Sequence, residues 1–161
     1  MAAPTVILPG FSATLYAQSG ATPTAVTTFN YTNLDAICIS ANQVKVEAVP
    51  AFGQDDAVAS FSVAGSRQSD KIPAQAAPTS MTITAAWNPS DTVIQQVRTD
   101  SISGVTERTY VIKATDGTGV VEYGFNARVG NFQIDAQPGA EAKATFTLHP
   151  RGNASGLVYS P

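Results

Sequence analysis

Charged side chains are scarce in this sequence. They make up 13% of the 161 residues, about half of the roughly 25% that is typical of soluble domains. Hydrophobic residues do not fill the deficit, because the mean hydropathy is only +0.02. Lys, Glu and Asp are depleted at protein–protein interfaces. The composition therefore favours a surface used largely for contacts with other proteins, with an exported, threonine-rich domain as the alternative.

The few basic residues are scattered along the chain. Nine Lys and Arg stand against twelve Asp and Glu, so the formal net charge is −3. A protein that grips nucleic acid tightly needs a concentrated basic face, and this sequence contains no such cluster. We therefore expect any relation to DNA to be non-adhesive.

Cysteine and histidine occur only once each, as Cys38 and His149. A single cysteine excludes an internal disulfide, and its apolar neighbours predict a buried thiol. A Cys38–His149 pair would require two distant residues to meet, without local support. Asp55 and Asp56 could contribute to a cation site, but no EF-hand spacing of acidic residues follows them. The segment Gly117-Thr118-Gly119 is not a phosphate-binding loop, because it lacks the required lysine. We expect no catalytic residues, no metal site, no cofactor and no enzymatic activity.

Long apolar runs are also missing. No run approaches the ~20 residues that a membrane-spanning helix needs. Residues 1–16 lack a basic segment, and Pro9 and Gly10 break their apolar stretch, unlike a secretory signal. We expect a chain that folds in a reducing cytoplasm without inserting into a membrane.

Alternation of apolar and polar residues predicts most of the secondary structure. After Gly130 shifts the phase of its strand, Phe132 and Ile134 continue the apolar side. The expected strands cover residues 43–49, 59–64, 79–87, 106–115, 121–129 and 142–148.

One helix interrupts this pattern. Asn88 is a suitable N-cap, Pro89 suits the first turn, and Gly104 lies past the expected end. The helix should cover about residues 89–100. The fold class is therefore expected to be a single, mainly β domain over residues 1–161, an antiparallel β-sandwich or partial barrel with one flanking α-helix.

Residues 65–78 are polar, contain two prolines and show no periodicity. We expect a loop there, longer than the usual 2–6 residues, which either binds a partner or is an ordinary surface loop. Residues 1–43 suggest an arm with an early strand or two, and residues 150–161 a tail rich in Gly, Ser and Pro.

A series of short motifs follows in a specific order from residue 81 to residue 151. It comprises Ala86-Trp87-Asn88-Pro89, Gln95-Gln96, Tyr110-Val111-Ile112, Asp116-Gly117, Tyr123-Gly124-Phe125, Val129-Gly130 and Arg151-Gly152. In this order the motifs resemble the major tail tube protein of long, non-contractile-tailed phages. The resemblance extends loosely to residues 44–65 and leaves residues 1–43 unmatched.

The resemblance implies a structural virion protein that self-assembles into stacked hexameric rings, forming the hollow tail tube through which DNA is ejected. The implied partners are other copies of the chain, the tape-measure protein, tail tip and terminator proteins, and passing DNA that is not specifically bound. It further implies a location in the virion tail after assembly in the host bacterial cytoplasm.

The resemblance also suggests roles for particular segments. Residues 1–20 and 150–161 would be arms that order on assembly. Residues 65–78 would join successive rings, and the candidate contacts in this inter-ring loop are Arg67, Asp70, Lys71 and Ile72.

Four acidic residues lie on strand positions opposite the expected core side. We consider Glu47, Glu107, Glu122 and Asp135 as candidates that line the lumen, with ordinary solvent-facing charge as the alternative for each. Trp87, Val93 and Val97 are expected to anchor the helix against the sheet.

The alternative function is a virion decoration protein or a receptor- or carbohydrate-binding β-sandwich. Such a module would stay monomeric or form a discrete ring, and it would carry an exposed aromatic patch in place of a long polar stacking loop.

Overall fold

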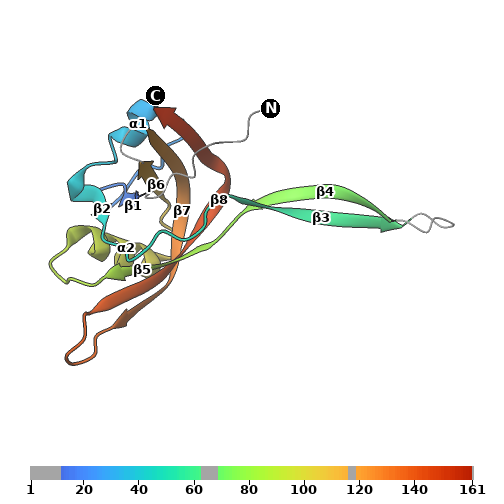
Figure 1. The fold of residues 1–161 in the computed structure, drawn as a ribbon. Helices are drawn as coiled ribbons and strands as arrows, with labels where there is room; N and C mark the ends of the chain where they lie inside the picture. Colours follow the sequence, from blue (N-terminus) through green and yellow to red (C-terminus); the bar gives the residue numbers. More distant parts are fainter. Residues whose placement is uncertain (1–11, 63–68, 116–118, 161) are drawn as a thin grey trace, which may run out of the picture.

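The computed structural model describes the backbone of residues 12–62, 69–115 and 119–160, and the side chains of these residues outside 54–77 and 152–160 (Figure 1). Six antiparallel strands form one curled sheet in the order β2-β1-β6-β7-β8-β5, and β3 pairs with β4 separately. This confirms the expected fold class in its partial-barrel form. The strands are β1 Ser12–Ala17, β2 Gln43–Val44, β3 Gln54–Ser62, β4 Ser69–Pro78, β5 Met81–Ala86, β6 Arg108–Thr115, β7 Val120–Asp135 and β8 Lys143–Ser160.

The main core lies on one side of the sheet, which we call the core face. Residues of one alternating phase, such as Tyr110 and Ile112 of β6 and Phe125 of β7, are fully buried there. The helix α2 (Thr92–Ser103) packs on this face through Val93, Ile94 and Val97. Because side chains alternate across a strand, the opposite phase forms a second face, which we call the outer face.

The two edges of the curled sheet approach each other. Residues 45–47 continue from β2 to β5, where the Ala86 N–H donates to the Lys45 carbonyl at 2.8 Å and the Glu47 N–H donates to that of Thr84 at 3.0 Å. The strand expected over residues 43–49 is therefore too long. Only Gln43–Val44 pair with β1, because the chain then crosses to β5.

The helix begins later than expected. Asp91 is the N-cap, and its carboxylate accepts from the Val93 N–H at 3.0 Å. Asn88 accepts instead from the Ser90 N–H at 2.9 Å, so its side chain closes a turn before the helix. The helix ends at Ser103, and Gly104 follows in the left-handed region with φ 67°, as the sequence predicts.

The phase shift predicted at Gly130 is confirmed. Gly130 pairs with Thr147 but Gln133 pairs with Thr145, so β7 carries a bulge between them. Phe132 therefore returns to the core face. Its ring centroid lies 5.9 Å from that of Phe146 and 5.9 Å from that of Trp87.

Residues 18–42, which we call the strap, cover part of the outer face. The strap includes α1 (Tyr31–Asp35) and the 3-10 turn η1 (Ser40–Asn42). Leu34 and Ile37 pack on Val111 of β6 in a second small cluster. The strap lies so close that a Cβ added to Gly124 would be 2.5 Å from Leu34 Cδ2.

The structure corrects the expected N-terminal arm. Residues 12–17 form β1, which pairs with β6 from Ser12 opposite Thr115 to Ala17 opposite Tyr110. Residues 18–20 begin the strap, so residues 12–20 belong to the body of the fold. Residues 1–11 lie outside the described residues.

The structure also corrects the prediction of a C-terminal arm. Strand β8 runs on to Ser160 and pairs with β7 as far as Ser160 opposite Val120. The glycines and prolines of this segment suggested a tail, but β7 offers a long partner edge that satisfies its backbone.

The long loop expected over residues 65–78 is wrong for residues 69–78, which form β4 (Figure 1). Strands β3 and β4 make a hairpin that projects from the six-stranded sheet. Pro73 and Pro78 suggested an irregular segment. Each strand of a two-stranded hairpin has an open edge, where a residue without an N–H is tolerated.

Within the described residues, neither α-helix has the length and apolar character required to cross a bilayer.

We predict that Gly124→Ala destabilises the protein by about 1–3 kcal/mol, because a methyl group there overpacks the site against the buried Leu34. The free energy of unfolding in urea would measure this. Gly130→Ala is the matched control, because its Cβ would meet only the exposed His149 ring, which can rotate away. Equal losses in the two variants would contradict the close contact between strap and sheet.

Candidate functional site

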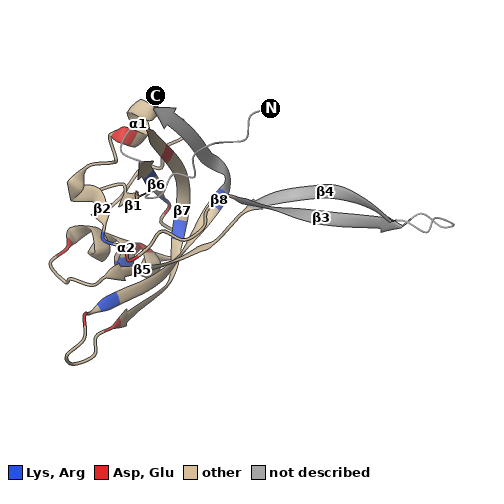
Figure 2. Cartoon of the chain, viewed as in Figure 1, with Lys and Arg blue, Asp and Glu red and all other residues tan. Residues whose placement is uncertain are grey.

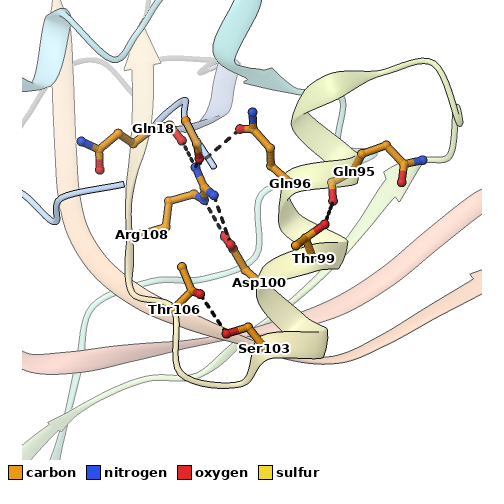
Figure 3. A network of polar contacts seen from close by, with 9 residues as sticks. Gln18, Gln95, Gln96, Thr99, Asp100, Ser103, Thr106 and Arg108 are labelled. Carbon is orange, nitrogen blue, oxygen red and sulfur yellow. Dashed lines mark hydrogen bonds and ion pairs between the residues drawn. The ribbon is translucent and has the colours of Figure 1, made fainter. Parts of the chain in front are cut away.

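A buried ion pair joins α2 to β6 (Figure 3). Arg108 Nε lies 2.5 Å from Asp100 Oδ2, and Arg108 Nη2 lies 3.1 Å from Asp100 Oδ1. Both side chains are almost inaccessible, at 1% and 3%. Arg108 occurs two residues before Tyr110 in β6, so its side chain points to the same core face. A charged group buried there needs a partner of opposite charge. This pair was not singled out from the sequence, although the position of Arg108 in the alternation of β6 was a signal that could have indicated a buried charge.

The same guanidinium also holds the start of the strap. Arg108 Nη1 donates to the carbonyl oxygens of Gln18 and Gly20, the latter at 3.0 Å. The Gln96 side chain approaches at 3.5 Å from α2. Figure 3 shows the guanidinium between α2 and Gln18. Because its donors are directed to protein oxygens, the adjacent cavity of about 150 Å³ is a structural junction and not an anion site.

A closed set of hydrogen bonds ties the strap to the outer face. The Val26 N–H donates to Thr109 Oγ1 at 2.9 Å, and Thr109 Oγ1 donates to Asn126 Oδ1 at 2.7 Å. Asn126 Nδ2 in turn donates to the Val26 carbonyl at 2.8 Å. Two paired residues of β6 and β7 thus satisfy both backbone groups of Val26.

Lys113 links α1 to the sheet. Its Nζ lies 2.9 Å from Asp35 Oδ1 and 3.0 Å from Glu122 Oε1. Burial lowers the pKa of Lys113, but the hydrogen bonds and charges of Asp35 and Glu122 outweigh this and raise it above its ordinary value. The ammonium therefore stays charged at neutral pH and compensates the carboxylates.

Glu122 corrects one prediction. It was expected to face solvent and was a candidate for the lumen, but its side chain is fully buried. The alternation of β7 does place it opposite the core, and the strap then covers that position. A local pattern could not reveal a cover supplied by a segment so far away in sequence.

Cys38 lies half-buried beside this cluster. Burial, followed by the negative charge of Glu122, raises the pKa of its thiol to about 12. The thiol is therefore protonated at neutral pH, which makes it a poor nucleophile.

The other three acidic candidates are distributed over two places. Glu47 is half-exposed and forms an ion pair with Lys143, whose pKa it raises, and Asp135 acts on the same lysine. Glu107 lies elsewhere, 3.3 Å from Arg151. The structure therefore gathers Glu47 and Asp135 near Lys143 and leaves Glu107 apart. Glu141, not considered from the sequence, joins the first group.

Three of the four candidate inter-ring residues lie in the hairpin. Asp70, Lys71 and Ile72 belong to β4, where Ile72 pairs in register with Ala59. Arg67 lies outside the described residues. Of the expected anchors, Val93 and Val97 are buried and Trp87 packs partly buried against the core.

A groove of about 480 Å³ around Trp87 is lined by side chains of both charge signs. It contains no nucleophile beside a base. Among the described residues, His, Cys, Asp and Glu nowhere gather in a group of three or more able to hold a metal ion.

No family model matches this sequence. No curated protein matches it either. Solved structures do share its fold. A chain from the PVC extracellular contractile injection system, in the sheath/tube terminator structure in the extended state, aligns over 99% of this chain and 100% of its own, with 12% identity and a TM-score of 0.63.

Two further structures extend the likeness. A chain of the anti-feeding prophage baseplate covers 98% of this chain and 97% of its own, at 13% identity and a TM-score of 0.60. The SPP1 tail tube covers 89% of this chain and 76% of its own, at 11% identity and a TM-score of 0.55. The chain therefore shares its fold with the SPP1 tail tube protein and with chains of the other two assemblies. One of these assemblies is a contractile injection system, so the fold alone does not single out the non-contractile-tailed phages.

We predict that Asp100→Asn destabilises the fold by about 3–5 kcal/mol, because it leaves the Arg108 charge buried without its partner. Glu107→Gln breaks the more exposed pair with Arg151 and should cost no more than about 1 kcal/mol. Urea unfolding of both variants measures the difference. A small, equal loss would mean that the buried pair does not organise the junction.

We also predict slow alkylation of Cys38. At pH 8 a thiol of pKa ~8.5 is about one-quarter thiolate, whereas a pKa of about 12 leaves roughly one molecule in ten thousand reactive. Iodoacetamide should therefore react more than about a hundredfold more slowly with the native protein than with the urea-unfolded chain. The native rate should rise with pH up to about 12. Equal rates for the native and the unfolded protein would contradict the raised pKa of the Cys38 thiol.

Proposed function

We propose that this chain is a non-enzymatic structural subunit that self-assembles into a hollow tail tube. The observation that carries the proposal is the likeness of fold, over nearly the whole chain, to proteins from tail-tube and injection-system structures. We further propose that the subunits form hexameric rings, that the rings stack, and that the tube conducts the tape-measure protein and then DNA.

The projecting β3–β4 hairpin supports self-assembly. An isolated two-stranded hairpin is marginally stable at best in water, and both of its strands expose unpaired backbone groups at their outer edges. The hairpin extends away from the six-stranded sheet of its own chain, so that sheet does not cover it (Figure 1). A neighbouring copy would supply that cover, so we assign the hairpin, in place of the expected loop, to contacts between successive rings.

The charge distribution supports passage of DNA without binding. Figure 2 shows basic and acidic positions interspersed over the described body. Of the seven basic residues whose side chains are described, five form ion pairs with carboxylates: Lys45, Arg108, Lys113, Lys143 and Arg151. Their charge is compensated within the chain and does not form the concentrated basic face that tight binding needs.

Glu47, Glu107 and Asp135 remain candidates to line the lumen, where acidic groups repel phosphates over about 10 Å at ~0.1 M salt. In this proposal the tube belongs to a virion tail of the phage type, assembled in the host bacterial cytoplasm. Tail tip and terminator proteins would bind its two ends.

Negative-stain electron microscopy of the purified protein tests the proposal directly. Long hollow tubes are the expected result. A persistent monomer at all concentrations would contradict tube formation and favour the decoration or receptor-binding alternative.

A shortened hairpin tests its role. In the variant, Asn-Gly replaces residues 59–72 and joins Val58 to Pro73, which are already opposite each other in the ladder. The body should keep its melting temperature, because the hairpin lies outside the core, but tubes should not form. Normal tubes from this variant would show that the hairpin does not join rings.

A further inference from the structure

The apolar side of β7 continues past the part of the core that α2 covers. Phe132 is packed against the core, but Ile134, next on the same side, is 42% exposed. Ile102, near the end of α2, is 77% exposed. Between them lies a groove of about 320 Å³, which we call the α2–β7 groove, lined by Arg98, Ser101, Ile102, Phe132 and Ile134.

The groove carries one uncompensated positive charge. Arg98 is exposed, and its guanidinium lies 6.0 Å from the centre of the Trp87 ring. No carboxylate of the described residues forms an ion pair with it. Arg98 and Ile102 are four residues apart on α2, so they lie one turn apart on the same side of the helix. The groove therefore fits a partner with an apolar group and a carboxylate at matching spacing.

The helix α1 of the same chain presents such a pair. Tyr31 is 40% exposed, and the side chain of Asp35 is 46% exposed. These two residues also lie one helical turn apart. Leu34 is fully buried under α1 and Lys113 holds Asp35, so the helix is fixed with this side outward. The spacing and the charge of the two surfaces are complementary.

The two surfaces lie on opposite sides of one subunit, because α1 covers the outer face while α2 packs on the core face. A contact between different patches of identical chains is head-to-tail, and it generates rings or filaments.

We propose that α1 of a second copy docks in the α2–β7 groove, antiparallel to α2. Asp35 of that copy then meets Arg98, and its Tyr31 packs against Ile102 and Ile134. This contact rests on the proposed self-assembly and assigns it a specific surface. The proposed contact has an apolar centre and one charge pair at its rim, which matches the usual composition of protein–protein interfaces.

Cysteine cross-linking tests the contact in the full chain. In a Cys38→Ser background, the variant Tyr31→Cys with Ile102→Cys should form a ladder of covalent oligomers on oxidation, because each copy contributes both surfaces. Mixing the two single-cysteine variants should give a mixed dimer. Both positions are exposed, so the substitutions should leave the fold intact.

The matched control pairs Tyr31→Cys with Thr92→Cys, which is exposed at the opposite end of α2. The contact should make the first pair cross-link at least about tenfold faster than the control, through its higher effective concentration. Tubes without a Tyr31–Ile102 cross-link, or equal rates for both pairs, would overturn the groove assignment while leaving tube formation intact. A ladder without tubes would support the groove and contradict the tube. Neither tubes nor cross-links would contradict both.

Discussion

The Arg108–Asp100 ion pair is the constraint on which the rest of the fold depends. Three separate pieces of the chain converge on one guanidinium: the end of α2, the start of β6 and the backbone where β1 leads into the strap. A buried charge of this kind must keep all its partners, because losing any one leaves a polar group unsatisfied in an apolar setting. The pair therefore fixes the helix on the core face and the strap on the outer face together, and these are the two surfaces from which the proposed contacts are built.

In the proposed function the surface of this chain serves assembly. Most charged side chains on the described body form internal pairs, and the described groove around Trp87 contains no nucleophile beside a base. The exposed features that remain are a hairpin without a core, an apolar groove with one free cation and a helix with one free aromatic ring. These features are suited to binding another copy, and they extend the likeness of fold into a physical account of how copies could meet.

The sequence predicts those parts of the fold that depend on short-range patterns. Alternation locates β5, β6, β7 and the first part of β8, Gly130 indicates the bulge, and Gly104 marks the end of α2. The errors have two different causes. Strand β4 is local to its partner β3, but prolines at an open strand edge resemble strand breakers in the sequence. Glu122 is buried, against expectation, because residues 18–42 cover it from far away in the sequence. Of the candidate residues, periodicity alone indicates the anchors Val93 and Val97, whereas no local pattern indicates the proposed contact between Asp35 and Arg98.

The partly polar surface beneath the strap has a consequence for how the protein moves. On β7 the residues under the strap are Glu122, Gly124 and Asn126, so the strap is held by hydrogen bonds, one ion-pair cluster and the small apolar cluster around Leu34. Lifting the strap exposes this small cluster together with polar groups that water solvates well, whereas lifting α2 exposes the larger main core. Local opening of residues 18–42 therefore costs less free energy than global unfolding, and the strap forms a separate, weaker cooperative unit of the fold.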